Sequence, residues 1–305
     1  MNILEPTYRK LVRTGELSRR IELAYEHLAA CDLCAQNCHV DRHATKKGIC
    51  HTGALAVLSS YGPHHGEENP LRGWLGSGTI FFAHCNLKCQ FCQNYSISQL
   101  GEGHEAQPEE IASIMLELQE MGCHNINFVS PSHVVAQILA AVGLAVEAGL
   151  RLPLVWNTGG YDSLAALQLL DGVVDIYMPD MKYADDKTAL RLSRAKNYIE
   201  VNRAAVQEMH RQVGDLMMDE RGIAQRGLLV RHLILPGGLA GTEEIARFLA
   251  DEVSRDTYIN VMAQYRPCYQ ASEHPPLDRP TTRKEYVDAV TACRAAGLHR
   301  FDKPF

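Results

Sequence analysis

The chain has 305 residues, 46% hydrophobic and 22% charged, which suits one large α/β domain or two ordinary ones with a packed core. The formal net charge of −6 provides no basic footprint for nucleic acid or for an anionic membrane. Because the first ten residues lack an apolar signal core and no apolar run is long enough to span a membrane, we expect a cytoplasmic protein that binds neither.

The ten cysteines are unevenly distributed along the chain. Seven of them lie between Cys31 and Cys92, and the other three are scattered over the remaining two thirds. In a cytoplasmic protein, grouped cysteines indicate metal or redox chemistry before disulfides. The distribution predicts an N-terminal module with a helix and a four-cysteine metal site over residues 1–75, followed by a regular body over residues 76–305.

The N-terminal module opens with a helical pattern over residues 16–30 and continues into four cysteines separated by two, three and eleven residues: Cys31, Cys34, Cys38 and Cys50. Four thiolates form a complete ligand set, so the site is expected to be structural or electron-transferring. Three bunched ligands and one remote ligand favour an auxiliary [4Fe–4S] cluster. Nearby histidines keep zinc as an alternative, and unmetallated cysteines are a third interpretation. The segment 61–78, rich in Gly, Pro and His, reads as a loop.

The body alternates between apolar strand patterns and amphipathic helix patterns. The predicted strands lie within residues 78–85, 125–130, 152–160, 174–183, 216–238 and 258–265. The predicted helices occupy residues 108–122, 133–149, 161–172, 184–213, 242–254 and 282–297. Six strand–helix units in order predict an α/β fold with a parallel sheet and outer helices, arranged as a partial (βα)6 TIM-like barrel.

Polar residues follow each predicted strand, where a barrel of this type carries its chemistry. They are His84 and Cys85, Ser130 to His133, Asn157 and Thr158, Asp180 and Lys182, Arg231 and His232, and Gln264 to Arg266. Strand ends are also where loops begin, so any one of these residues can be polar for that reason alone. As a set, they predict one shared pocket at the C-terminal edge of the sheet.

Three cysteines stand directly after the first body strand, separated by three and two residues: Cys85, Cys89 and Cys92. A cubane iron–sulfur cluster takes one thiolate per iron, so three cysteines leave the fourth iron open to a substrate or cofactor. The alternatives are buried cysteines without a metal, or a zinc site completed by His84.

This triplet, with Phe91 immediately before its last cysteine, resembles the radical S-adenosylmethionine (SAM) superfamily. The resemblance implies a [4Fe–4S] cluster whose fourth iron is chelated by SAM. Reductive cleavage of SAM then gives methionine and a 5′-deoxyadenosyl radical, which abstracts a hydrogen atom from the substrate. The cofactors supply this chemistry and the protein positions them. A one-electron donor such as flavodoxin or ferredoxin is implied as a partner.

Six segments, from FFAHCNLKCQFC to NVMAQYRP, together resemble the pyruvate formate-lyase activating enzyme-like (PflX-type) branch of that superfamily. True glycyl-radical activating enzymes share this core, and the resemblance to them implies that Asp180 and Lys182 lie at SAM, together with a monovalent cation beside the SAM carboxylate. Asn157 stands where relatives have Asp, and the sequence SPSH (130–133) stands where they have Gly-Gly-Glu. The implied SAM-binding residues are Phe91, Ser130, His133, Asn157, Thr158, Asp180, Lys182 and Arg231.

The resemblance leaves the substrate open. One hypothesis is activation of a glycyl-radical enzyme, which requires a large protein partner. A second is radical modification of a small molecule or of another protein or peptide. A third is a non-catalytic iron–sulfur protein that transfers electrons. Cys268 and Tyr265, after the last body strand, are candidates for giving a hydrogen atom to a substrate radical, although a buried thiol and an ordinary aromatic contact are the favoured explanation of the two residues.

Overall fold

A single mixed sheet runs through the computed structural model, which describes residues 5–44 and 48–302. The strand order is β10-β9-β8-β6-β5-β4-β2-β1-β3, and β7 pairs with β8. The strands are β1 (Ala56–His64), β2 (Ser77–Phe82), β3 (His104–Ala106), β4 (Ile126–Val129), β5 (Leu154–Thr158), β6 (Ile176–Pro179), β7 (Met217–Met218), β8 (Ala224–Leu233), β9 (Tyr258–Met262) and β10 (Arg300–Phe301).

Every pairing from β2 through to β10 in this order is parallel, and each of β2, β4, β5, β6, β8 and β9 is followed by a helix. The helices are α1 (Tyr8–Arg13), α2 (Glu16–Glu26), α3 (Asn69–Arg72), α4 (Tyr95–Ser98), α5 (Pro108–Glu120), α6 (Val135–Glu147), α7 (Leu164–Leu170), α8 (Asp186–Ser193), α9 (Tyr198–Val213), α10 (Thr242–Phe248) and α11 (Arg283–Ala295). Within the described chain the outer strands β3 and β10 do not pair, so the barrel stays open. The predicted partial (βα)6 barrel is therefore confirmed.

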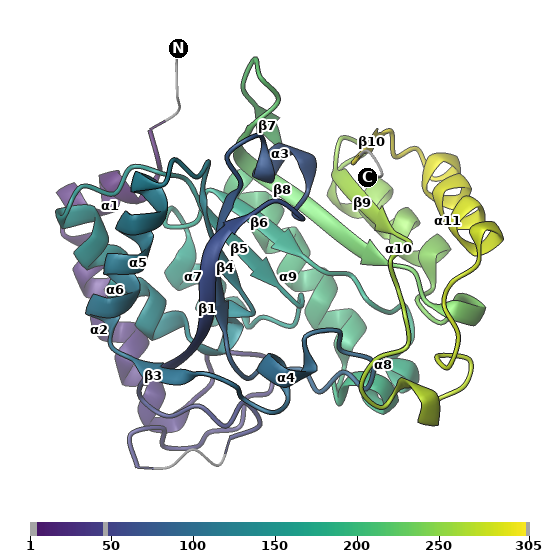
Figure 1. Ribbon diagram of the computed structural model, residues 1–305, viewed down its shortest axis with the longest axis horizontal. Helices are drawn as coiled ribbons and strands as arrows, with labels where there is room; N and C mark the ends of the chain where they lie inside the picture. The colour runs from purple at the N-terminus through teal and green to yellow at the C-terminus, as the bar shows by residue number, and fades with distance from the viewer. Residues whose placement is uncertain (1–4, 45–47, 303–305) are drawn as a thin grey trace.

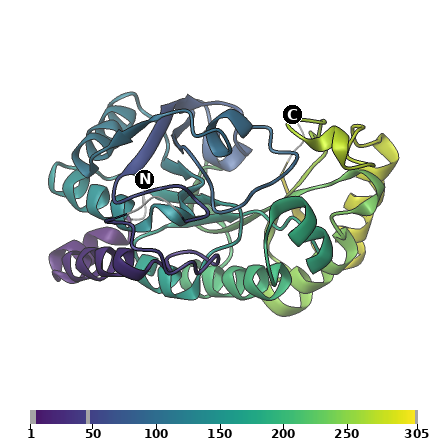
Figure 2. The same cartoon turned by 90° about the horizontal axis from the view of Figure 1, so that it is seen from below.

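The helices cover the outer face of the curved sheet. Figure 2 shows them in sequence, from the purple N-terminal helices to yellow α11. In Figure 1, α3 lies at the upper edge of the sheet, whereas α4 and α8 lie at the lower edge, where the parallel strands end. The two ends of the barrel are thus distinct, and only the lower one carries the three-cysteine loop that precedes α4.

The alternation predicted from sequence has a direct packing cause. Side chains such as Phe82, Phe128 and Trp156 point outward from β2, β4 and β5 and form one continuous core with the helices. Local sequence then sets several helix starts. The Thr282 hydroxyl accepts from the Glu285 amide while the Glu285 carboxylate accepts from the Thr282 amide, which caps α11 at both groups. At the starts of α7 and α8, the side chains of Ser163 and Asp185 each accept a hydrogen bond from the backbone amide three residues later.

The loop prediction for residues 61–78 is wrong in part. The strand β1 continues to His64 and pairs antiparallel with β2, with Pro63 opposite Gly78, and α3 forms a short helix within the same segment. Pairing with the neighbouring strand outweighs the turn preference of Gly and Pro, because Pro is tolerated in a strand where its missing N–H is not needed. Turn propensity alone therefore hid a strand that pairs with β2 on one side and β3 on the other.

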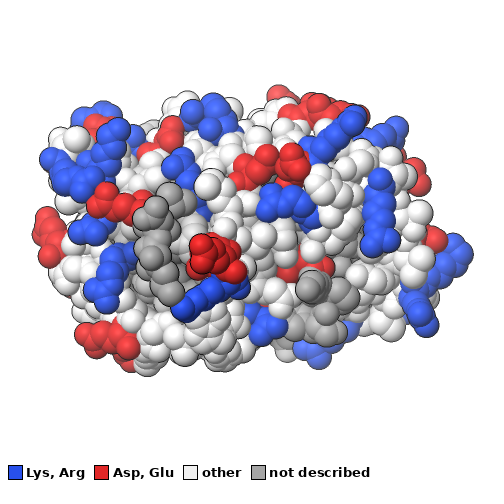
Figure 3. All heavy atoms as spheres, turned by 90° about the horizontal axis from the view of Figure 1, so that it is seen from above, with Lys and Arg blue, Asp and Glu red and all other residues white. Residues whose placement is uncertain are grey.

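The N-terminal module packs directly on the barrel: α1 and α2 contact α6, and β1 belongs to the common sheet. The division at residue 75 stays a prediction, and the outermost residues of the two predicted ranges, as well as 45–47, lie outside the described residues. No helix among those described is long and apolar enough to cross a membrane. On the face around α3 and β7, basic and acidic side chains are interspersed without a patch of one sign (Figure 3).

Candidate active site

The three-cysteine loop starts at Cys85, directly after the two-residue bend that follows β2. Each of its three sulfurs lies within hydrogen-bond distance of a different polar group. Cys85 Sγ accepts from the Leu87 amide at 3.4 Å, Cys89 Sγ accepts from Ser193 Oγ at 3.0 Å, and Cys92 Sγ lies 3.0 Å from Ser98 Oγ. Hydrogen bonds to cysteine sulfur are the usual surroundings of an iron–sulfur cluster and tune its potential.

The donor set fits an iron–sulfur cluster. Burial, with smaller contributions from the Cys92 and Cys85 sulfurs, raises the pKa of the Cys89 thiol to about 12 even though the Lys182 charge opposes the shift. A metal is therefore needed to hold these sulfurs as thiolates. Among the described residues, no three His, Cys, Asp or Glu side chains are grouped to hold one metal ion. A cubane does not require such a grouping, because each cysteine binds a separate iron.

Four predicted residues meet beside this loop, at the ends of β5, β6 and β8. Arg231 donates from Nε to Asp180 Oδ1 at 2.8 Å and from Nη2 to Asn157 Oδ1 at 2.7 Å. Lys182 Nζ donates to the other oxygen of Asp180 at 2.5 Å. Thus one carboxylate joins two cations, and the neutral Asn157 amide still serves as an acceptor in the place where an Asp was expected from the resemblance.

The charges in this group support one another. Burial opposes ionisation of Asp180, but the charges of Arg231 and Lys182 outweigh it and lower the pKa of its carboxyl. Burial likewise disfavours the charged Lys182, yet Asp180 and the Cys89 sulfur raise the pKa of its ammonium group. Lys182 therefore carries a positive charge next to the three-cysteine loop. It links that loop electrostatically to the strand-end residues.

A glycine turn after β5 brings these elements together. Gly160 has φ of +72°, and a Cβ at that position would lie 2.2 Å from the Asp180 carbonyl oxygen. The Asn202 amide fastens the two segments, since its Nδ2 donates to the carbonyls of Gly160 at 2.9 Å and Asp180 at 3.1 Å. Only glycine combines this backbone conformation with so close an approach.

The remaining predicted SAM-binding residues follow β4 and β5. Ser130 adopts a left-handed conformation with φ of +57° and remains partly exposed. The Thr158 hydroxyl is occupied, because it donates to Asp162 Oδ2 at 2.6 Å and lies 2.8 Å from Ser132 Oγ. Ser130 and His133 are the two residues of the loop after β4 that were expected to bind SAM. Ser130 is the more accessible of the two, because His133 is buried.

His133 is turned toward the protein backbone. It is 1% exposed, and its Nε2 lies 3.1 Å from the Ala83 carbonyl oxygen, which precedes the three-cysteine loop by two residues. Burial, followed by the charge of Arg42, lowers the pKa of its imidazole to about 3, so the ring is neutral at physiological pH. This contact gives His133 a structural role under the loop, and its predicted contact with SAM stays a prediction.

Aromatic residues enclose the end of the three-cysteine loop. The Phe91 ring packs edge-on against Tyr265 and Tyr183, with centroids 5.9 and 6.4 Å apart. The Tyr265 hydroxyl donates to the Leu277 carbonyl at 2.6 Å, whereas Cys268 is partly exposed. The segment carrying both residues is fixed to the loop, since the Gln270 amide donates to the Gln90 carbonyl at 2.9 Å. The structure therefore places Tyr265 beside Phe91 and attaches the segment that carries Cys268 to the three-cysteine loop.

The four-cysteine module lies against the same loop. Gln36 Nε2 donates to the Asn86 carbonyl at 2.7 Å, and the His51 and His84 rings lie 6.0 Å apart. Cys31, Cys34 and Cys50 are buried, and the charges of Cys50, Cys31 and Cys38 all act on Cys34, whose pKa is raised mainly by burial. The module thus brings three buried cysteines and the half-buried Cys38 close to the second cysteine group.

Sequence reasoning missed several buried polar residues around the site. Arg42 joins the module to the barrel by donating to the carbonyls of Gly53 and His133, and Glu67 and Glu68 lie inside the barrel near Arg231. Arg42 gave no signal beyond its position in a cysteine-rich segment. Two adjacent glutamates in a segment predicted to be a loop are normally exposed to solvent. The composition of this segment therefore predicted exposed side chains, whereas both are buried.

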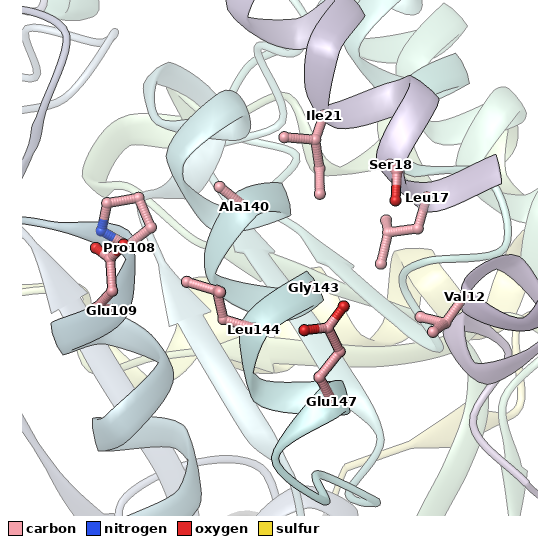
Figure 4. Close-up of a pocket in the computed structure, with 10 residues that line it drawn as sticks. All are labelled: Val12, Leu17, Ser18, Ile21, Pro108, Glu109, Ala140, Gly143, Leu144 and Glu147. Carbon is pink, nitrogen blue, oxygen red and sulfur yellow. The ribbon is translucent and has the colours of Figure 1, made fainter. Parts of the chain in front are cut away.

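A separate hollow of about 280 Å³ lies on the outer surface between α1–α2 and α5–α6 (Figure 4). Leu17, Ile21 and Leu144 provide its apolar wall, and Glu109 and Glu147 add carboxylates. No cysteine or strand-end residue lines it. It is therefore distinct from the candidate site at the barrel end.

Comparison with known proteins gives the family. Residues 79–218 match the radical SAM superfamily. "Uncharacterized protein MJ0674" of Methanocaldococcus jannaschii is 32% identical over 289 residues, covering 92% of this chain and 78% of that protein.

Three solved structures are similar at a TM-score of 0.44 each. TYW1 with a lysine–pyruvate adduct is 10% identical over 71% of this chain and 73% of that one. Streptococcus suis SuiB bound to the precursor peptide SuiA is 12% identical over 72% and 46%, and HydG, a maturase of the [FeFe]-hydrogenase, is 13% identical over 72% and 49%. By its sequence match and its relative, this chain belongs to the radical SAM superfamily and is an enzyme of the kind that uses a [4Fe–4S] cluster and SAM.

Proposed function

We propose that this protein reductively cleaves SAM at a cluster held by Cys85, Cys89 and Cys92 and uses the resulting radical to abstract a hydrogen atom from a substrate. The observation that carries the proposal is the position of the Asp180–Lys182–Arg231 group beside Cys89, at the ends of two neighbouring parallel strands. A buried ammonium and a guanidinium at that place suit the carboxylate of SAM. A protein that only transferred electrons would have no use for them there.

When bound, the cluster and SAM supply the electron and the radical, while this chain's residues bind and shield them. Lys182 and Arg231 provide positive charge for a carboxylate. Ser130, partly exposed after β4, is placed to accept from an amino group, and Phe91 provides an aromatic face for adenine. Asp180 keeps both cations charged and oriented. The aromatic residues around Phe91 restrict the access of water to this end of the barrel.

A monovalent cation beside SAM is the part of the resemblance with the least support. Both oxygens of Asp180 already accept hydrogen bonds, one from Lys182 and one from Arg231, and Asn157 Oδ1 accepts from Arg231. These contacts occupy the oxygens that would otherwise coordinate a cation. We therefore propose that Arg231 takes over the cation's electrostatic role.

An anaerobic assay tests the reaction. Protein reconstituted with iron and sulfide, then given SAM and dithionite, should release 5′-deoxyadenosine. The variant Cys89→Ala should release none, whereas Cys123→Ala, which removes a buried cysteine outside both groups, should behave like the wild type. Absence of 5′-deoxyadenosine from the reconstituted wild type would overturn the proposal.

The electron donor and the substrate are further proposals. The donor is expected to be a flavodoxin or ferredoxin, and the substrate a glycyl-radical enzyme in the first hypothesis. A glycine-centred radical, seen by electron paramagnetic resonance on a co-incubated partner, would support that hypothesis. Product on a peptide or small molecule without such a signal would support the second one. Because the Tyr265 hydroxyl is engaged with Leu277, Cys268 is the better candidate for a hydrogen donor.

We also propose that Cys31, Cys34, Cys38 and Cys50 bind an auxiliary [4Fe–4S] cluster. Three of these ligands are bunched along the chain and the fourth is remote, a spacing that favours an iron–sulfur cluster over the two close pairs usual for zinc. The double variant Cys31→Ala/Cys34→Ala should lose about four of about eight irons, with matching sulfide. Loss of zinc with unchanged iron would instead identify a zinc site.

A further inference from the structure

Two adjacent glutamates lie inside the barrel at the end opposite the three-cysteine loop. The chain leaves β1, turns through Glu67 and Glu68, and enters α3, which lies at the upper edge of the sheet in Figure 1. Their exposed fractions are only 7% and 4%. Carboxylates are rarely buried so completely unless they have charged or hydrogen-bonding partners, so their surroundings require an explanation.

The partners of this pair come from β1, β8 and β9. Glu67 Oε2 lies 4.0 Å from Arg231 Nη1 of β8, and its other oxygen lies 3.5 Å from His64 Nδ1. Glu68 Oε1 accepts from Asn260 Nδ2 of β9 at 2.9 Å. Arg231 and Asn260 are direct neighbours in the β8–β9 register, so their side chains leave the same face of the sheet. The turn before α3 is thus attached to the strand that carries Arg231.

Arg231 is held from three directions. Its Nε donates to Asp180, its Nη2 donates to Asn157, and its Nη1 faces Glu67. A guanidinium is planar and rigid, so two acceptors, Asp180 and Asn157, fix its plane, and the Glu67 carboxylate adds a charge contact from a third element. Glu67 brings a carboxylate oxygen to Nη1 on the inner side, and the charge of the neighbouring Glu68 acts on the same guanidinium. Asp180 and Asn157 set the plane of the guanidinium, and the Glu67 charge attracts its Nη1 end.

The charges along this line alternate in sign. The side chains of Glu67, Arg231, Asp180 and Lys182 follow one another from the end of the barrel near α3 to the neighbourhood of Cys89. Burial raises the pKa of the Glu68 carboxyl to about 7, whereas His64 and Arg231 overcome burial and lower the pKa of Glu67. The pair thus keeps one firm negative charge on Glu67. That charge matches the one guanidinium it faces.

We propose that Glu67 is a positioning residue for the SAM site, acting through Arg231 to hold Asp180 and Lys182 in place, and that Glu68 supports it from Asn260. This inference rests on the proposed function, because it assumes that Asp180 and Lys182 bind SAM. Glu67 itself stands apart from the reacting groups. Its effect is on the affinity for SAM, through the arrangement of residues that lie between it and the three-cysteine loop.

The decisive variants change the charge of Glu67 with little change in shape. Glu67→Gln should raise the KM for SAM about tenfold, a typical coupling for residues in one buried network, while kcat stays within about twofold. The iron content and the electron paramagnetic resonance signal of the reduced cluster without SAM should match the wild type, whereas the SAM-induced change in that signal should require more SAM. Glu67→Asp, which retains the charge, should bind SAM more tightly than Glu67→Gln. The exposed Glu243→Gln is the matched control.

A double-mutant cycle shows whether the effect passes through Arg231. Glu67→Gln should have almost no further effect on SAM binding in an Arg231→Gln background. Additive effects of the two changes, equal SAM affinity of Glu67→Gln and wild type, or equal affinity of Glu67→Asp and Glu67→Gln would each overturn the inference. Failure of the proposed function looks different, because the wild type itself would then neither bind SAM nor form 5′-deoxyadenosine.

Discussion

Arg231 donates its Nε hydrogen to Asp180 Oδ1 at 2.8 Å, across the neighbouring strands β8 and β6. The two residues also form a bridge in the backbone pairing of the sheet, so strand geometry and side-chain charge fix the same contact. Because Lys182 shares the carboxylate, Asp180 is the residue on which the local charge balance depends.

Asp180→Asn should therefore harm both folding and activity. The change leaves two mostly buried cations without their shared anion, and breaking such a pair costs about 3–5 kcal/mol of unfolding free energy. We expect 5′-deoxyadenosine formation to fall about 100-fold, since 1.4 kcal/mol corresponds to a factor of ten. Urea unfolding and the anaerobic assay measure the two effects. Asp251→Asn, at an exposed position, is the control, and an unchanged activity of Asp180→Asn would refute the role given to Asp180.

Ser193→Ala should change the redox behaviour of the cluster held by Cys89. The Ser193 hydroxyl donates to Cys89 Sγ at 3.0 Å, and a hydrogen bond to sulfur stabilises the more negative, reduced state. Loss of a bond of about 1 kcal/mol should lower the midpoint potential by up to about 40 mV for one electron. Potentiometric titration followed by electron paramagnetic resonance measures it. Ser113→Ala on α5 should leave the potential unchanged, and an equal potential in Ser193→Ala would contradict the assignment.

Acid should destabilise the protein partly through His133. Its pKa is lowered to about 3 in the folded protein, against about 6.5 when unfolded, so the unfolded chain binds the additional proton. The stabilisation from this group is present above pH 6.5 and is lost as the pH falls toward 3, by at most about 1.4 kcal/mol per pH unit. In urea unfolding between pH 7.5 and 5, His133→Gln should show a shallower slope. The exposed His299→Gln should keep the wild-type slope; identical slopes for all three proteins would exclude the effect.

Gly160→Ala should disturb the site more than a backbone change of the same kind elsewhere. A Cβ would lie 2.2 Å from the Asp180 carbonyl, in addition to the cost of about 1–2 kcal/mol for a left-handed alanine. Gly15 has a similar φ of +74° with nothing within 4 Å of its Cβ position, so Gly15→Ala isolates the backbone term. We expect Gly160→Ala alone to weaken SAM binding. Equal losses of stability in both variants, with normal SAM binding, would show that the close approach is unimportant.

Much of the architecture could be predicted because it depends on local pattern. The six strand–helix units follow from apolar runs and helical periodicity, and the strand-end residues Asn157, Asp180 and Arg231 meet because parallel strands end at one edge. The cysteine spacing likewise gave the family before any geometry was known. These features depend on residues close together in the chain or on a general rule of sheet architecture.

The residues that escaped prediction depend on distant partners. Glu68 is paired with Asn260, 192 positions away, and nothing in the local sequence GEEN distinguishes a buried glutamate from a solvated one. Arg42 is buried by carbonyl groups of the module and of His133, which become neighbours only in the folded chain. The strand β1 was hidden by Gly62 and Pro63, whose usual preference for turns is overridden by pairing with β2.

The attachment of the three-cysteine loop to the last part of the chain has a consequence for biosynthesis. Gln93 Nε2 donates to the Gln264 carbonyl, 171 positions later, and the Gln270 amide donates to the Gln90 carbonyl. Contacts of such long sequence separation form late in folding, because the intervening chain must be ordered first. During synthesis, the loop can reach its final form only after the ribosome has released residue 270. Insertion of the cluster that it carries is therefore expected to follow translation of nearly the whole protein.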